Sequence, residues 1–78
     1  MKVVKILGTG CANCVKLEKL VLVVKQEQGL NIDVQKVTAI PDILAYGIMS
    51  TPGLVLDEKV MVAGRVPSKA EVEKILTA

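Results

Sequence analysis

The chain has 78 residues, which is enough for one small domain, and 51% of them are apolar, so a packed core can form without disulfide staples. The net charge is +2 with acidic and basic residues interspersed, and Tyr46 is the only aromatic residue, which together argue against a nucleic-acid or anionic-membrane surface. The first apolar run ends at Gly8 and is too short for a signal peptide or a membrane span. We therefore expect a cytoplasmic protein with one domain over residues 1–78 and neither a nucleic-acid nor a membrane partner.

The first predicted elements are a buried strand and a long helix. Residues 3–7 form a nearly continuous apolar run, which is typical of a central strand covered on both faces. After the cysteines, apolar residues recur at the spacing of one helix face: Leu17, Leu20, Val21 and Val24. The β-branched residues in 21–24 also suit a strand, but the charged flanks and the length of residues 15–28 favour a helix that ends at Gly29.

The next two predicted elements are an edge strand and a short helix. Residues 31–37 alternate between apolar and polar, which predicts a half-exposed strand. A strand, a helix and a second strand in this order form a right-handed crossover, so the two strands are expected to be parallel neighbours. Pro41 stands at a first helical position and Gly47 ends the segment, which predicts a helix of about two turns. The apolar stripe expected on this helix consists of Ile40, Ile43 and Leu44.

The last third of the chain predicts a β-hairpin and a closing helix. Residues 54–56 and 60–63 are short apolar strands at hairpin spacing, separated by residues 57–59. Residues 68–71 read Ser-Lys-Ala-Glu, a capping box that starts a helix with an apolar stripe at Val72, Ile75 and Leu76. The predicted order is therefore β-α-β-α-β-β-α, which is an α/β fold.

The chemically distinctive segment is residues 8–14, which contains both cysteines of the chain. Cys11 and Cys14 are three residues apart at a helix start, so they share one face and are close enough for a small disulfide ring. A helix start favours a thiolate, and the two glycines of the segment keep the approach to Cys11 open. A C-x-x-C between a strand and a helix predicts a dithiol redox site. The alternatives for this spacing are a metal site and plain buried cysteines.

Three features make the chain resemble the thioredoxin-fold family, in particular the small redox-active disulfide proteins of archaea and bacteria. They are Gly-Cys-Ala-Asn-Cys at 10–14, Ser-Thr-Pro at 50–52 before the third strand, and Gly64 after the fourth. The resemblance spans essentially the whole chain and implies three helices and a four-stranded mixed sheet in the order 2-1-3-4. It also implies that Pro52 is a cis-proline facing the disulfide. Residues implied to bind an extended substrate peptide are Gly10, Thr51, Pro52 and Gly64.

The resemblance implies a thiol-disulfide oxidoreductase. Cys11 would be the attacking thiolate and Cys14 the resolving thiol, passing two electrons through a mixed disulfide. The implied partners are a disulfide-containing protein substrate and an upstream reductase, and the protein is expected to be a monomer. No bound cofactor is implied, because the dithiol is itself the redox group. Thioredoxin itself has an aromatic residue where Gly10 stands and Gly-Pro between its cysteines, so its redox potential does not carry over.

The C-x-x-C segment also resembles the metal loop of heavy-metal-associated domains, where two thiolates hold a soft ion such as Cu(I). Those domains run β-α-β-β-α-β, whereas this chain predicts a helix over residues 41–46 and a closing helix. A zinc site is disfavoured, because two cysteines without histidine cannot supply four nitrogen or sulfur ligands. We therefore assign no metal ligand.

By itself Thr51-Pro52 is an ordinary strand-leading proline, which base rates favour as trans. Relatives commonly have glycine in the hairpin turn where this chain has Glu58, and a left-handed backbone there would cost roughly 1 kcal/mol.

Overall fold

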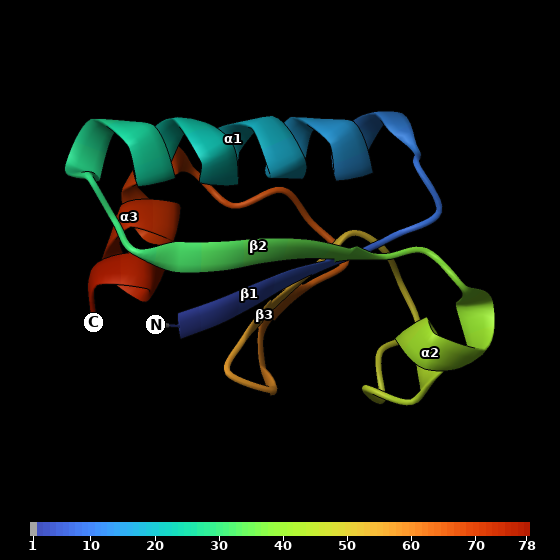
Figure 1. The fold of residues 1–78 in the computed structure, drawn as a ribbon. Coiled ribbons are helices and arrows are strands. Elements are labelled where there is room, and N and C mark those ends of the chain that lie inside the picture. Colours follow the sequence, from blue (N-terminus) through green and yellow to red (C-terminus); the bar gives the residue numbers. More distant parts are fainter. Residues whose placement is uncertain (1) are drawn as a thin grey trace.

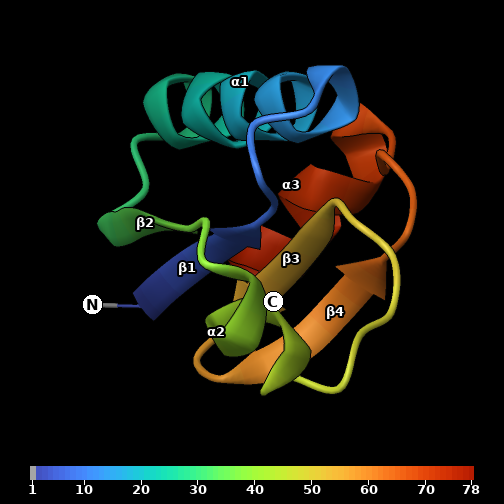
Figure 2. The same ribbon diagram turned by 90° about the vertical axis from the view of Figure 1, so that its right-hand side faces the viewer.

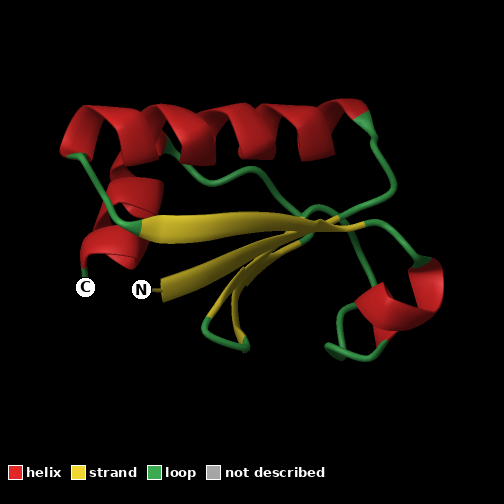
Figure 3. Ribbon diagram, in the orientation of Figure 1, coloured by secondary structure: helices red, strands yellow, loops and turns green. Residues whose placement is uncertain are grey.

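The computed structural model describes residues 2–78, which form three helices and a four-stranded sheet (Figure 1). In chain order the elements are β1 (Lys2–Leu7), α1 (Ala12–Gln28), β2 (Ile32–Val37), α2 (Ile40–Leu44), β3 (Gly53–Leu56), β4 (Lys59–Ala63) and α3 (Lys69–Thr77). This order confirms the β-α-β-α-β-β-α prediction, and Figure 3 shows how helices and strands alternate. Within residues 2–78, no helix combines the length and the apolar character needed to cross a membrane.

The sheet is mixed and has the strand order β2-β1-β3-β4. Strand β1 is parallel to β2 on one side and antiparallel to β3 on the other, so Val4 lies between Val34 and Leu56. Strand β4 continues the antiparallel part next to β3. Both the 2-1-3-4 order and the mixed strand directions agree with the fold expected from the sequence.

Both faces of β1 are covered, as its apolar run predicts. Val4 and Ile6 point into a cluster made with α1 and α3, whose other buried members include Leu17, Val21 and Val72. Leu7 points to the opposite face, where it packs with Ile43, Ile48 and Val55. Figures 1 and 2 show the two longer helices over one face of the sheet and α2 beside the other. In Figure 1, the start of α1 and α2 both lie on the right-hand side of the molecule.

Helix α1 confirms the helical alternative for residues 21–24. Its buried residues are spaced by three or four positions, which is the periodicity of one helix face: Cys14, Leu17, Val21 and Val24. The helix ends at Gly29, which has the left-handed backbone (φ 60°) that glycine adopts without strain. At the other end of the chain, the Ser68 side chain accepts the backbone N–H of Glu71 and caps α3, as the capping box predicts.

Helix α2 is shorter and more exposed than the sequence predicts. It spans five residues, Ile40–Leu44. After the Ala45 N–H, the backbone N–H groups donate to carbonyls three residues earlier instead of four, as the Tyr46 N–H does to the Ile43 carbonyl, and the α-helix ends. Only Ile43 of the expected stripe is buried. The side chains of Ile40 and Leu44 are 60% and 57% exposed, so most of this apolar stripe lies on the surface. Helix α2 packs against the sheet with one side only, and of Ile40, Ile43 and Leu44 only Ile43 lies on that side.

The β3–β4 loop has two residues, Asp57 and Glu58, because Lys59 already belongs to β4 and not to the turn. Both have a left-handed backbone, with φ values of 48° and 68°, as the type I′ form of a two-residue hairpin loop requires. Strand β1 supports the turn. The N–H of Val3 donates to Asp57 Oδ1 and its carbonyl accepts the Asp57 N–H, each at 2.9 Å. These bonds offset part of the conformational cost of a left-handed residue other than glycine.

Candidate active site

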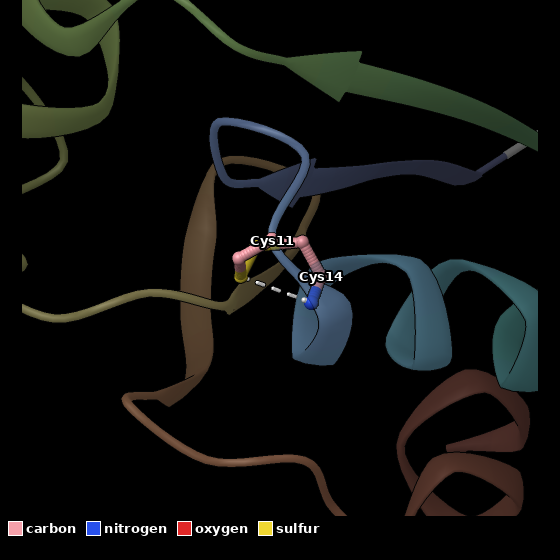
Figure 4. The surroundings of a disulfide bond; sticks show 2 residues. All are labelled: Cys11 and Cys14. Atoms are coloured by element: carbon pink, nitrogen blue, oxygen red, sulfur yellow. Dashed lines mark hydrogen bonds between the residues drawn. A yellow bond between two sulfur atoms is a disulfide. The ribbon is translucent and has the colours of Figure 1, made fainter.

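The two cysteines form a disulfide at the junction of β1 and α1 (Figure 4). Their Cα atoms are 5.0 Å apart, within the range that a disulfide requires. Cys11 lies just before α1 and Cys14 lies in its first turn. The pairing that the C-x-x-C spacing allows is therefore present.

Cys11 is the N-cap residue of α1. Its sulfur accepts the backbone N–H of Cys14 at 3.2 Å, drawn as the dashed line in Figure 4, and its carbonyl accepts the N–H of Val15 at 3.0 Å. The first turn of α1 contains no acidic residue. An N–H donor and the positive end of the helix dipole both favour negative charge on the Cys11 sulfur when the disulfide is reduced.

The two cysteines differ sharply in exposure. Cys11 is exposed, whereas Cys14 is only 5% exposed and belongs to the core. Cys14 packs against Gly8, where a Cβ would lie 2.3 Å from the Cys14 sulfur. Gly8 therefore makes room for Cys14, a role that the sequence did not predict. Gly10 has a left-handed backbone (φ 95°) and open space where its side chain would be.

The loop before β3 lies next to the dithiol. The Thr51–Pro52 peptide bond is cis in this structure, with Thr51 exposed and Pro52 buried. The Thr51 Cβ is 3.9 Å from the position a Gly8 Cβ would occupy, which places this loop beside the β1–α1 junction. The carbonyl of Pro52 accepts the N–H of Gly64 at 2.9 Å. A Cβ at Gly64, whose φ is 80°, would lie 3.1 Å from the Ser50 Cβ. The structure thus brings Thr51, Pro52 and Gly64 together.

An ion pair fixes the segment that follows Gly64. The Arg65 guanidinium donates two hydrogen bonds to the Glu71 carboxylate, at 2.9 and 2.8 Å. These bonds from Arg65 lower the pKa of Glu71, and the hydrogen bond to Glu71 raises the pKa of Arg65. The loop after β4 is thereby tied to the first turn of α3.

A second charged cluster lies away from the dithiol, where a hollow of about 420 Å³ opens between α2 and the hairpin turn. The Lys5 ammonium donates to Glu58 at 2.6 Å and to the Tyr46 hydroxyl at 3.0 Å. The hydrogen bond to Glu58 raises the pKa of Lys5, and the same bond lowers the pKa of Glu58. This cluster connects β1, the hairpin turn and the segment after α2, and the cysteines do not contribute to it.

Sequence reasoning missed two charged residues beside Cys14. Glu18 lies one helix turn after Cys14, and its carboxylate is 3.4 Å from the ammonium of Lys36 on β2. Both residues line a small hollow that Cys14 also lines. The spacing of four residues from Cys14 to Glu18 is visible in the sequence, and helix periodicity alone points to it. Lys36 depends on the packing of β2 against α1, for which the sequence gives no local signal.

Comparison with known proteins agrees with the fold. A family model described as a thioredoxin domain matches residues 2–77. The thioredoxin of Methanothermobacter thermautotrophicus is 40% identical over 77 residues, which cover 99% of this chain and 100% of that protein. The thioredoxin of Methanocaldococcus jannaschii is 32% identical over 76 residues, covering 97% of this chain and 87% of that protein.

The chain order after α1 separates the two families that share a C-x-x-C start. Helix α2, the β3–β4 hairpin and the closing helix α3 follow β2 in this structure. Heavy-metal-associated domains have a hairpin directly after the first helix and finish on a strand, so this order differs from theirs. The fold, the C-x-x-C disulfide and the similarity to thioredoxins over nearly the whole chain agree. The chain belongs to the thioredoxin domain family and is a thiol-disulfide oxidoreductase.

Proposed function

We propose that Cys11 and Cys14 are the redox couple and exchange two electrons with disulfides of proteins or small molecules. The observation that carries this proposal is the asymmetry of the pair. Cys11 is exposed at the N-cap with an N–H aimed at its sulfur, whereas Cys14 is buried one turn inside α1. An exposed sulfur whose negative charge is stabilised suits nucleophilic attack, and a buried partner three residues away suits the closure of an intramolecular disulfide.

The reaction has two displacement steps. The Cys11 thiolate attacks one sulfur of the substrate disulfide, a mixed disulfide forms, and the other substrate sulfur leaves as a thiolate. Cys14, after losing its proton, attacks the Cys11 sulfur, and the remaining substrate sulfur leaves as a second thiolate. The substrate disulfide has then gained two electrons, and the Cys11–Cys14 disulfide has formed.

The substrate segment is proposed to lie across Gly10, Thr51, Pro52 and Gly64. Two of these residues are glycines, and the Pro52 side chain is buried, so little side chain stands in the way of an extended peptide. Close to the dithiol, Thr51 is exposed and available for contact. A peptide laid against such a segment gains affinity through backbone groups, and this mode accepts many sequences.

The proposed partners follow from the reaction. A disulfide-containing protein is the substrate, and an upstream reductase must return the Cys11–Cys14 disulfide to the dithiol for each new cycle. The cytoplasm is the proposed location, because its reducing poise keeps a catalytic dithiol reduced. We further propose that the monomer is the active form, since both cysteines come from one chain.

The test is reduction of insulin disulfides with dithiothreitol as the electron source, followed by the turbidity of the released chains. The wild-type protein should accelerate the reaction, and Cys11→Ser should abolish the acceleration. Cys14→Ser should form a mixed disulfide through Cys11 that persists on non-reducing gels and disappears with excess dithiothreitol. Activity that survives in Cys11→Ser would refute the assignment of the attacking sulfur.

A further inference from the structure

Helix α1 has an apolar stripe on its solvent side as well as on its core side. Val15, Leu22 and Val23 are 40%, 45% and 42% exposed. Together with Lys19 they recur every three or four residues, so these side chains lie along one face of the helix. Figures 1 and 2 show α1 along an outer side of the molecule, with the sheet and α3 on only one side of it. A surface helix is normally polar on its outer side, so this apolar stripe indicates a face that a partner covers.

The stripe begins next to the dithiol. The Val15 N–H donates to the Cys11 carbonyl at 3.0 Å, so Val15 lies one helix turn from the exposed cysteine. A helix rises 1.5 Å per residue, which places Lys19 about 12 Å and Leu22 about 17 Å from Cys11 along the axis. A typical protein interface covers about 800 Å² of each partner, a patch roughly 16 Å in radius. A protein joined to Cys11 is therefore large enough to cover this face of α1.

The charges around the stripe select the kind of partner. Both glutamates of α1, Glu18 and Glu27, already form salt bridges with lysines of other elements. Lys16 and Lys19 are exposed, and neither takes part in a salt bridge among residues 2–78. The outer face of α1 therefore offers positive charge beside apolar side chains, which complements a partner surface with carboxylates and apolar groups.

The same charges disfavour a second copy of this chain as the partner. Lys19 lies at the middle of the stripe, between Val15 and Val23. Two copies packed antiparallel by this stripe would bring their Lys19 residues together near the symmetry axis. Like charges placed together oppose association, so a different protein fits this surface better.

We propose that Val15, Lys19 and Leu22 form a docking surface for protein substrates that carry acidic and apolar side chains near the reactive cysteine. The proposal rests on the function proposed above, because Cys11 must hold the substrate. Lys19 pairs with a substrate carboxylate, while Val15 and Leu22 contact its apolar side chains. This surface favours the productive encounter and leaves the chemistry at Cys11 unchanged, so it adds a preference that backbone contacts at Thr51 and Pro52 do not supply.

The experiment uses synthetic peptides whose single cysteine is in a disulfide with nitrothiobenzoate. The Cys11 thiolate attacks the peptide sulfur, and nitrothiobenzoate leaves as a thiolate whose absorbance reports the rate. One peptide carries Leu and Glu within about four residues of its cysteine on either side, a reach of roughly 13 Å when extended. A second peptide has Lys in place of Glu. The nitrothiobenzoate disulfide of mercaptoethanol reports Cys11 reactivity without any peptide contact.

The charge variant is Lys19→Glu, and its matched control is Lys59→Glu, because Lys59 is also exposed but lies on β4 at the hairpin. The wild type should react about tenfold faster with the acidic peptide than with the basic one at low salt, and this ratio should approach one at about 0.5 M salt. Lys19→Glu should abolish or reverse the preference, whereas Lys59→Glu should retain it. All three proteins should react equally with the mercaptoethanol compound, which shows that the dithiol is intact.

Leu22→Ser tests the apolar part of the surface. It should slow both leucine-containing peptides several-fold and leave the reaction with the mercaptoethanol compound unchanged. Equal rates with the two peptides in the wild type, or a preference that survives in Lys19→Glu, would overturn the proposal.

Two further results would assign the face of α1 to another occupant and so overturn the proposal. One is binding to phosphatidylglycerol vesicles that Lys19→Glu loses, and the other is a dimer in sedimentation that Leu22→Ser loses. A wild-type protein that releases no nitrothiobenzoate even from the mercaptoethanol compound would instead refute the proposed function itself.

Discussion

The sulfur of Cys14 rests against the backbone of Gly8, and the two residues leave no room between them for a methyl group. A Cβ built at Gly8 would lie 2.3 Å from the Cys14 Sγ and 3.0 Å from its Cβ, both far inside van der Waals contact. Gly8, the first residue after β1, therefore fixes how closely α1 approaches the end of β1.

Gly8→Ala should destabilise the protein, because the new methyl group displaces Cys14 or the start of α1. Overpacking of this kind typically costs about 1–3 kcal/mol of the free energy of unfolding. Urea unfolding of the oxidised protein measures it. Thr9→Ala is the control, because Thr9 is adjacent but exposed, and a change of less than about 0.5 kcal/mol is expected there. Equal stabilities of Gly8→Ala and wild type would contradict the contact.

Cys11 should be alkylated faster than Cys14 in the reduced protein. Exposure and the N–H directed at its sulfur both favour reaction of Cys11, and the buried position of Cys14 opposes it. We expect a difference of about tenfold or more. Brief iodoacetamide labelling followed by peptide mass spectrometry measures both rates, and unfolded protein provides the reference in which the rates converge. Equal rates in the folded protein would remove the distinction between the two sulfurs.

The Arg65–Glu71 pair should make stability depend on acid. Hydrogen bonds from Arg65 hold the pKa of Glu71 below its ordinary value of 4.5. A depressed folded-state pKa means that the contribution is complete above the unfolded value and is lost as pH falls through the folded value. Glu71→Gln should therefore lower Tm at about pH 7 and have a smaller effect at about pH 3. A Tm difference that does not shrink in acid would contradict this.

Leu54→Ala should be among the most damaging single substitutions, because Leu54 is fully buried between the sheet and the two longer helices. Removal of such a side chain leaves a cavity and costs about 2–5 kcal/mol of the free energy of unfolding. The matched control is Leu44→Ala, since Leu44 on α2 is 57% exposed and should change stability by about 0.5 kcal/mol or less. Similar losses in the two variants would show that α2 buries more apolar surface than its exposed residues indicate.

Much of the fold could be predicted because its local signals agree. The apolar run of β1, the helical spacing of Leu17, Val21 and Val24, and the capping box at Ser68 each identified an element that the structure contains. The strand order 2-1-3-4 came from the family resemblance and not from periodicity. Pairing between strands that are distant in the chain has no local signature, so the strand order could be predicted only from the resemblance to a known fold and not from the hydrophobic pattern.

The misses have physical causes. An apolar stripe does not reveal how much sheet is available to cover it, so the sequence did not distinguish the buried Ile43 from the exposed Ile40 and Leu44. Gly8 was interpreted through its own flexibility, although its role depends on a sulfur six residues away that packs against it. The Glu18–Lys36 pair joins a helix to a strand, and only the packing of those two elements brings the side chains together.

The position of β1 in the sheet has a consequence for how the chain folds during synthesis. Strand β1 is synthesised well before β3, residues 53–56, yet it lies inside the sheet and pairs with that later strand. Until that later segment emerges, one edge of β1 has no partner and its apolar side chains lack the contacts that β3 and α3 supply. The backbone hydrogen bonds of α1 and the bond from the Cys14 N–H to the Cys11 sulfur join residues close in sequence, so they can form earlier than the pairing of β1 with β3. The redox segment can thus form before the sheet that supports it, and the final compaction of the domain waits for its C-terminal third.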